Sequence, residues 1–290
     1  MANTQALKRR IRSVGNTQQI TKAMELVAAT KMRRVQDAAS KAHTYADAAM
    51  TALGRLSANV EIKYNPFFRP VGDNKLYIIF NSDRGLAGAY NANIFNAAAT
   101  AFAADKKSGT RPSVITYGRK GARYFARGTN IELLGEYENI ADIPDINIFA
   151  PVIETITDAV MAGKFGAIDL IYTESLSTLS QRVRTLNLVP IKPPEEVADA
   201  KGPAEIVYEL EPNAEVVLDS AIKLYLQASL WRARIEAAAA EHAMRMISMN
   251  NANRNAGDLI DGLTLELNAT RQAAITQEMA EIISAAEAIA

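Results

Sequence analysis

Residues 7–34 read LKRRIRSVGNTQQITKAMELVAATKMRR, with one glycine and no proline. Mostly apolar side chains recur in this stretch at alternating steps of four and three residues, the spacing of one face of a helix. The repeat continues for about seven heptads, more than the three or four that indicate a coiled coil. The sequence therefore predicts one long helix over residues 1–60. Its repeat positions are Leu7, Ile11, Val14, Gln18, Thr21, Glu25, Ala28, Met32, Val35, Ala39, Ala42, Ala46, Ala49, Leu53 and Leu56.

A second long helix is predicted over residues 213–290, and it supplies the packing partner that a lone helix needs. All ten prolines and eleven of the fifteen glycines lie between residues 66 and 212, so breakers of regular structure gather in the middle of the chain. Because that middle returns the chain, we expect the two arms to pair antiparallel. Residues 1–50 hold nine Lys or Arg and three Asp or Glu, whereas the second arm holds six and ten, which favours this orientation. The stripe of the second arm begins Val217, Ala221, Leu224, Ala228, Trp231, Ile235, Ala238 and His242.

Polar residues interrupt the first repeat at Gln18, Thr21 and Glu25. Either they control the register of the helix pair, or this section lies near a polar contact or faces a second protein. An apolar strip that includes Met24 occupies another face of the same helix. Two faces that can pack favour a shaft that is surrounded by other protein.

The middle of the chain, residues 70–210, is predicted to be a Rossmann-like α/β domain. Short apolar runs with the composition of strands alternate with helical segments near residues 90–105, 119–127 and 147–162. This alternation favours a mostly parallel sheet with right-handed crossovers. The predicted strands are KLYIIF, SVITYG, IELLG, AIDLIYT and RVRTLNLVPI.

Composition argues against several classes of function. The chain has no cysteine and only two histidines, far apart in sequence, so we expect no thiol chemistry and no metal site. Basic and acidic residues both number 32, and residues 1–44 lack the aromatic side chains on which bases would stack, which argues against nucleic acid. No stretch has the roughly 18 to 20 apolar residues of a membrane span. The first residues lack the apolar core of a secretory signal.

Two glycine-containing turns, NSDRGLAGAYN (81–91) and YGRKGARYFARG (117–128), resemble phosphate-binding turns in outline. Neither matches a complete nucleotide-binding motif, so tight turns are favoured and no cofactor is expected. No nucleophile–base arrangement is visible around Ser175, Ser177 or Ser180, so no catalytic residue is predicted.

The chain ends in TRQAAITQEMAEIISAAEAIA (270–290), which has helical spacing to its end. The second arm exceeds the first by about 20 residues, so we expect its end to project beyond the pair and to need a partner from outside this chain. Its apolar stripe is Ile275, Met279, Ile282, Ala286 and Ile289.

The stretch 7–34, the turn 81–91, AEHAMRMISMNNANRNAGDLI (240–260) and TRQAAITQEMAEII (270–283) resemble the gamma subunit of bacterial F-type ATP synthases, in order and from end to end. This resemblance implies a rotor without catalytic residues. Its long antiparallel coiled coil would turn inside three alpha and three beta subunits, and its α/β domain would lie against the epsilon subunit and the ring of c subunits. Proton flow would drive ATP synthesis at sites on the beta subunits.

The resemblance also assigns roles to residues. Arg271, Gln272 and Thr276 would bind a beta-subunit loop, the stripe from Ile275 to Ile289 would lie in an apolar sleeve, and Met24, Arg33 and Arg34 would form a shaft face. It implies attachment at the cytoplasmic face of a bacterial membrane, with membrane contact only through the complex. The alternatives are a structural coiled-coil tether with an α/β head and, more remotely, an enzyme with a helical lid.

Overall fold

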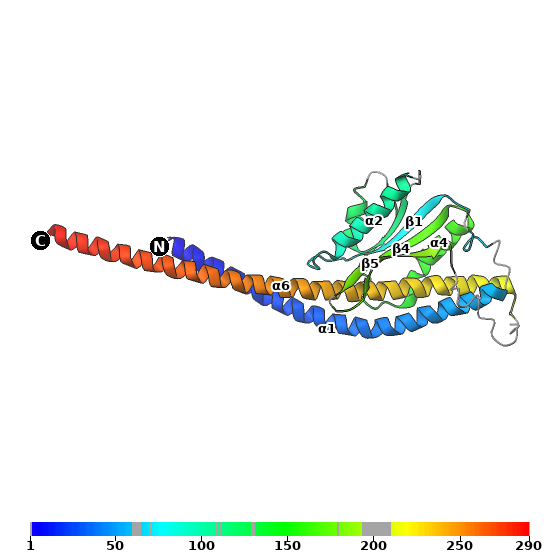
Figure 1. Cartoon of the computed structure of the whole chain (residues 1–290), viewed down its shortest axis with the longest axis horizontal. Helices are drawn as coiled ribbons and strands as arrows, with labels where there is room; N and C mark the ends of the chain where they lie inside the picture. Colours follow the sequence, from blue (N-terminus) through cyan, green and yellow to red (C-terminus); the bar gives the residue numbers. More distant parts are fainter. Residues whose placement is uncertain are drawn as a thin grey trace. The chain divides into compact units, whose positions relative to one another are not determined.

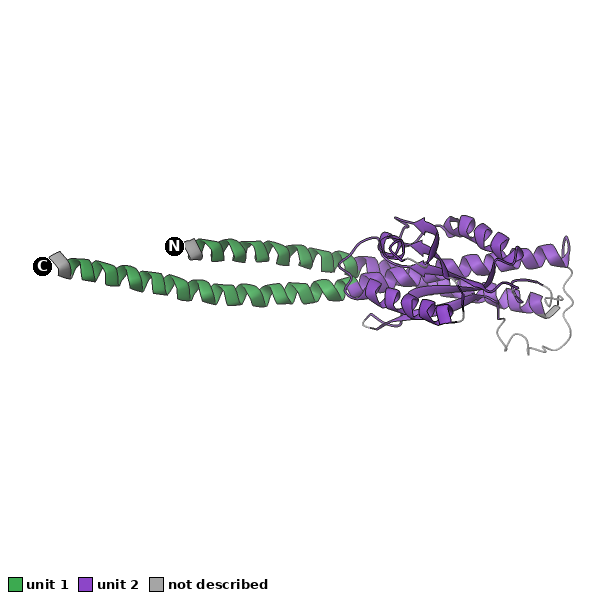
Figure 2. Cartoon of the chain, turned by 90° about the horizontal axis from the view of Figure 1, so that it is seen from above, with its two compact units in different colours: residues 1–29, 245–290 green, residues 30–244 purple. Residues whose placement is uncertain are grey.

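The computed structural model describes residues 2–59, 65–69, 71–107, 109–110, 112–128, 131–178, 180–192 and 210–289. Two long helices, α1 (Ala2–Asn59) and α6 (Ala214–Ile289), flank the other elements in sequence (Figure 1). The chain divides into two compact units (Figure 2). Unit 1 comprises residues 1–29 and 245–290, and unit 2 comprises residues 30–244.

Unit 2 contains a five-stranded sheet of order β3-β2-β1-β4-β5. The pairs β1–β2, β2–β3 and β1–β4 are parallel, and β5 runs antiparallel to β4. The predicted, mostly parallel α/β domain is therefore confirmed. Its elements are β1 (Asn74–Phe80), α2 (Tyr90–Lys107), β2 (Pro112–Tyr117), α3 (Arg119–Phe125), β3 (Glu132–Tyr137), η2 (Ile146–Phe149), α4 (Ala150–Met161), β4 (Phe165–Ser175) and β5 (Gln181–Val189).

Apolar side chains cover the sheet on both faces, because alternate residues of a strand point to opposite sides. On β1, Leu76 and Ile78 belong to a core cluster with residues of α4 and α6, whereas Tyr77 and Ile79 belong to a second cluster with α2 and α3. Every residue of β2 is buried. Burial on both faces explains why these strands read as continuous apolar runs in the sequence.

The first part of α6 covers the sheet as well as pairing with α1. Leu226 and Leu230 lie in the sheet's core cluster, whereas Leu224, which belongs to the predicted pairing stripe, is 38% exposed. The sequence predicts a single partner, α1, for this stripe, but this part of α6 buries one face against α1 and another against the sheet. All residues of 233–240 are consequently buried.

Within unit 2, small side chains form the contact between the two long helices. Val35 and Ala42 of α1 cluster with Ile235, Ala238 and Ala239 of α6. Nearer the end of α1, two further alanines cluster with Ala228. Residue numbers rise along α1 as they fall along α6, so the predicted antiparallel pairing is confirmed.

Within unit 1, the polar residues that interrupt the repeat of α1 face polar residues of α6. Asn253 Nδ2 donates a hydrogen bond to the Gln18 carbonyl oxygen at 2.9 Å. Gln18 Nε2 donates in return to the Asn253 carbonyl oxygen at 3.5 Å. Asn250 Nδ2 donates to Glu25 Oε1 at 3.2 Å. These paired contacts fit a role in fixing the register of the two helices.

Candidate functional site

The end of α6 exposes the apolar stripe that the sequence singled out. Figure 2 shows α6 continuing past the N-terminal end of α1 within unit 1. Ile275, Met279 and Ile282 are 45%, 55% and 69% exposed. Ala286 is exposed too, and the side chain of Ile289 lies outside the described residues. A row of exposed apolar side chains along one helix is typical of a surface that binds a partner.

The polar residues predicted to bind a partner lie at the start of this exposed end. Arg271, Gln272 and Thr276 are all exposed. The Thr276 hydroxyl donates to the Gln272 carbonyl oxygen of its own helix at 3.0 Å. The guanidinium and amide groups one turn before the apolar stripe thus provide hydrogen-bond donors on an accessible helical surface.

The three residues of the predicted shaft face divide between the two units. Met24 lies in unit 1, whereas Arg33 and Arg34 lie in unit 2. Met24 is half-buried, and both arginines are exposed. On the same unit as Met24, Ile20 and Val27 are 60% and 57% exposed. Each unit therefore exposes part of the predicted face.

The turn 81–91 leads from β1 into α2, and its polar side chains contact β2, α3 and the residues after β3. Asn81 Nδ2 donates to Thr116 Oγ1 at 2.6 Å, and Asn81 Oδ1 accepts from the Gly121 backbone N–H at 2.7 Å. Asp83 accepts backbone N–H bonds from Arg119 and Asn139, both at 3.0 Å. A Cβ at Gly118, whose φ is +123°, would lie 2.4 Å from Asn81 Oδ1. The polar groups of the turn join the ends of neighbouring strands, as expected of a tight turn.

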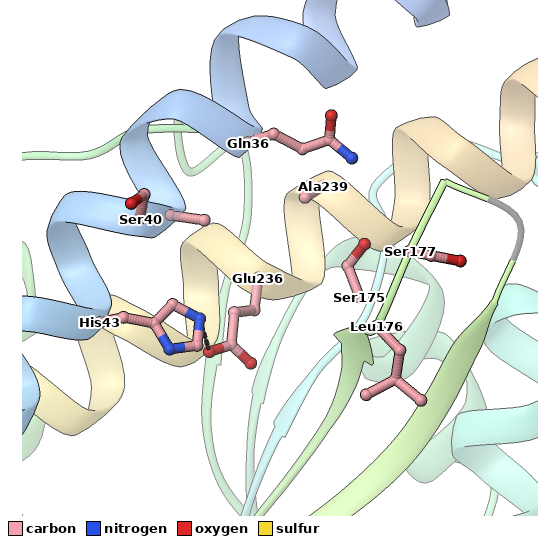
Figure 3. Close-up of a pocket in the computed structure, with 9 residues that line it drawn as sticks. Gln36, Ser40, His43, Ser175, Leu176, Ser177, Glu236 and Ala239 are labelled. Atoms are coloured by element: carbon pink, nitrogen blue, oxygen red, sulfur yellow. Dashed lines mark ion pairs between the residues drawn. The ribbon is translucent and has the colours of Figure 1, made fainter.

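A cavity of about 230 Å³ lies in unit 2 between α1, α6 and the turn that joins β4 to β5 (Figure 3). Glu236 is 2% exposed at its wall, and its Oε1 lies 2.7 Å from His43 Nε2 and 2.8 Å from Arg232 Nε. The Ser177 hydroxyl accepts from the Ser180 backbone N–H within the turn. In these contacts the His43 imidazole pairs with Glu236, and the Ser177 hydroxyl stabilises the turn. Residues lining the cavity are Gln36, Ala39, Ser40, His43, Ser175, Leu176, Ser177, Glu236 and Ala239.

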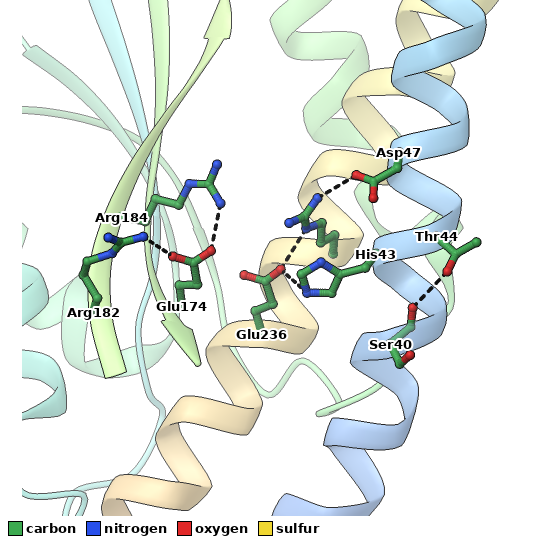
Figure 4. Close-up of polar contacts among 9 residues, drawn as sticks. Ser40, His43, Thr44, Asp47, Glu174, Arg182, Arg184 and Glu236 are labelled. Atoms are coloured by element: carbon green, nitrogen blue, oxygen red, sulfur yellow. Dashed lines mark hydrogen bonds and ion pairs between the residues drawn. The ribbon is translucent and has the colours of Figure 1, made fainter. Parts of the chain in front are cut away.

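Further charged contacts link α1 to α6 and β4 to β5 (Figure 4). Arg232 Nη1 lies 3.1 Å from Asp47 Oδ1 of α1. Glu174 contacts Arg182 at 2.8 Å and Arg184 at 2.9 Å. Burial raises the pKa of Glu174, but the hydrogen bonds and charges of the two arginines outweigh burial and lower the pKa overall. Across the described part of the chain, no group of three His, Cys, Asp or Glu side chains could hold a metal ion.

A second charged cluster, which was not predicted from the sequence, lies where the loop after β3 meets the long helices within unit 2. Asp142 Oδ2 lies 3.0 Å from His242 Nε2 of α6 and 3.3 Å from Lys31 Nζ of α1. The hydrogen bond from His242 lowers the pKa of Asp142 well below its usual range, against the opposing effect of burial. These residues are distant in sequence, and no periodicity links them.

The fold and the exposed helical end define a protein in which an α/β domain is inserted in the sequence between two paired helices, one of which exposes an apolar stripe at its end. The family model described as ATP synthase matches residues 3–289. The gamma chain of ATP synthase from Desulforamulus reducens is 36% identical over 290 residues, covering 100% of each chain. That from Granulibacter bethesdensis is 39% identical over 300 residues, again covering 100% of each. The chain therefore belongs to the ATP synthase gamma chain family.

Solved structures share the fold at lower sequence identity. A chain of the Euglena gracilis mitochondrial ATP synthase, in a structure of OSCP, F1 and c-ring, matches with a TM-score of 0.69 and 17% identity over 99% of this chain and 95% of that chain. A chain from the central stalk and c-ring of the Tetrahymena thermophila mitochondrial ATP synthase matches with a TM-score of 0.60 and 22% identity over 80% and 99%.

Proposed function

We propose that the chain is the central rotor shaft of an F-type ATP synthase and couples proton flow through a membrane ring to ATP synthesis and hydrolysis at sites on beta subunits. Residues 1–60 and 213–290 form the shaft, and residues 70–210 form its α/β head. The observation that carries this proposal is the exposed apolar end of α6 in a member of the gamma chain family. A helix with that surface needs a sleeve supplied by other subunits.

The partners we propose are three alpha subunits, three beta subunits, an epsilon subunit and a ring of c subunits. The end of α6 would lie in the alpha–beta ring, with Ile275, Met279 and Ile282 against an apolar sleeve. Arg271, Gln272 and Thr276 would form hydrogen bonds with a beta-subunit loop. Met24, Arg33 and Arg34 would face the surrounding subunits along the shaft.

We further propose that the chain is not catalytic and reaches the membrane only through the complex, at the cytoplasmic face of a bacterial cell. No helix among the residues described is long and apolar enough to cross a membrane. The described contacts of the cavity and of the turn 81–91 are structural. The purified chain, free of alpha and beta subunits, should not hydrolyse ATP; turnover by that preparation would contradict a role as rotor alone.

The decisive experiment is rotation. The chain has no cysteine, so a single cysteine at an exposed residue of the α/β domain can carry a bead without competing labels. With three alpha and three beta subunits immobilised, ATP should turn the bead in one direction. A static tether would co-purify with the same subunits while the bead stayed still, and that result would overturn the rotor function.

A further inference from the structure

We propose that the segment 138–147, here named the joint segment, is the torque joint of this rotor and that Asp142 is its central positioning residue. The joint segment leads from β3 into η2 and contacts both long helices within unit 2. By fixing α6 to the α/β domain, the joint segment would make the helix rotate whenever the domain rotates. This inference rests on the proposed rotor function.

Polar side chains at four positions of α6 contact the joint segment. Gln227 Nε2 donates to the Ile146 carbonyl oxygen at 3.2 Å. Trp231 Nε1 donates to the Pro144 carbonyl oxygen at 3.0 Å. Arg234 Nη2 donates to the Ile140 carbonyl oxygen at 2.9 Å. The contact of His242 with Asp142 is the fourth. Steps of four, three and eight residues keep these side chains on one side of the helix.

Asp142 connects the joint segment to both helices with a single carboxylate. Its Oδ2 lies near His242 of α6 and Lys31 of α1, and its Oδ1 lies 3.9 Å from Arg234 Nη2. The His242 side chain is only 6% exposed, so its contact is shielded from water and salt. The apolar side chain of Ile143, next to Asp142, packs against the cluster formed by α1 and α6.

Directional contacts are what a torque joint requires. The apolar cluster between α6 and the sheet holds the two together, but hydrophobic attraction has no preferred direction. Such a surface resists separation more than it resists sliding or rotation of the helix about its axis. Hydrogen bonds weaken steeply when their angle changes. Donors spread along α6 and fixed to one loop therefore oppose axial rotation directly.

Glu138 provides a matched control within the same segment. Its carboxylate lies 2.9 Å from Arg119 Nε of α3, so this ion pair stays inside the α/β domain. Its side chain is 34% exposed and that of Asp142 is 31% exposed. Glu138→Ala and Asp142→Ala thus remove similar groups, and only the second loosens the domain from the helices.

The test uses the complete ATP synthase in inverted membrane vesicles and measures protons pumped per ATP hydrolysed. Asp142→Ala combined with Arg234→Met should lower this ratio at least about tenfold, the factor that corresponds to loss of even one of the charge-assisted contacts that this variant removes. Hydrolysis by the alpha–beta–gamma complex detached from the membrane should stay within about twofold of wild type, since the shaft then turns without load. A double variant that pumps like Glu138→Ala would overturn the inference. If even the wild-type complex did not rotate or pump, the proposed function would fail instead.

A disulfide provides a second test that separates coupling from folding. Asp142→Asn keeps the shape of the side chain and removes its charge. In that background, Gln227→Cys and Asn147→Cys replace two side chains whose Nε2 and Oδ1 atoms lie 3.2 Å apart. Oxidation should restore pumping per ATP to the wild-type ratio, and reduction should lower it again. An equal ratio in both states, with the disulfide confirmed by mass spectrometry, would refute the torque joint.

Discussion

Replacing Ala42 with leucine should destabilise the protein, because the contact between α1 and α6 has no room for a larger side chain. Ala42 and the facing Ala238 are both 0% exposed, and Ala239 beside them is 1% exposed. The added carbons would favour burial by about 0.8 kcal/mol per methylene group if space existed. Without space the helices must separate, and the contacts of Val35 and Ile235 loosen with them. Overpacking of this kind costs about 1–3 kcal/mol.

Urea unfolding of the purified chain, followed by circular dichroism, measures this cost. Ala48→Leu is the matched control, since Ala48 is exposed on the same helix. The control should change the free energy of unfolding by no more than about 0.5 kcal/mol. If Ala42→Leu lowered it no more than Ala48→Leu does, the helices would not approach as closely as their alanines indicate, and the reasoning would be refuted.

Three further predictions concern the end of α6 and the joint segment. Arg271→Leu with Gln272→Leu should slow ATP hydrolysis by the assembled complex while leaving its yield unchanged, since loss of these donors removes about 1–3 kcal/mol per bond from a much larger interface; normal hydrolysis with intact assembly would show that the contact role belongs elsewhere. Ile275→Ala, measured in parallel, should slow hydrolysis less, because a sleeve holds an apolar side chain without directional bonds; a larger effect than that of the double variant would contradict the sleeve. Asp142 has a pKa lower in the folded state than its ordinary value of about 3.9, so its contribution to stability is present above that value and is lost as pH falls through the folded pKa. The difference in unfolding free energy between wild type and Asp142→Asn should therefore shrink from about pH 5 to about pH 3, and a constant difference would exclude this source of stability.

The sequence predicted those elements whose burial requires either a periodic pattern or a continuous run of apolar residues. β1 and β2 were found because burial on both faces demands an apolar run. α1 was found because one face of it is buried along its length, from Leu7 to Leu53. The beginning of α6 was only partly understood, because a helix buried on several sides no longer shows one stripe. Its Ala-rich stretch 233–240 contains a buried arginine and a buried glutamate. Arg234 donates to the loop after β3, and Glu236 contacts His43 of α1 as well as Arg232 of α6.

The contacts give mixed support to the charge argument for antiparallel pairing. His43 of α1 contacts Glu236 of α6, with the base on α1 and the acid on α6. In the ion pair between Asp47 and Arg232, the acid belongs to α1 and the base to α6, the reverse of the overall charge of the two arms. Most basic residues of α1, such as Arg33 and Arg34, are exposed instead. Net charge along a helix therefore says little about its contact face, where alanines decide how closely the helices approach.

The candidate site likewise has one part that the sequence could predict and another that it could not. The exposed end of α6 could be predicted because a stripe at helical spacing with no partner in the chain is visible in sequence. The role proposed for Arg271 and Gln272 rests on resemblance alone, since an exposed arginine has no distinguishing pattern of its own. The joint segment could not be predicted at all. Asp142 meets His242 only because the sheet places its loop beside α6, and such a contact depends on the whole topology.

The alanine contact and the joint segment restrict different movements of the same helix. Alanines at Ala42 and Ala238 fix the distance between α1 and α6, and their loss or enlargement changes the free energy of unfolding. The polar contacts of Asp142 and Arg234 fix the angle of α6 about its own axis, and a load on the shaft tests that angle directly. Ala42→Leu should thus lower stability while the molecules that assemble pump normally, whereas the Asp142 and Arg234 variant should assemble and slip. Because the two predicted effects separate, the distance and the angle of the helix can be assigned to different residues.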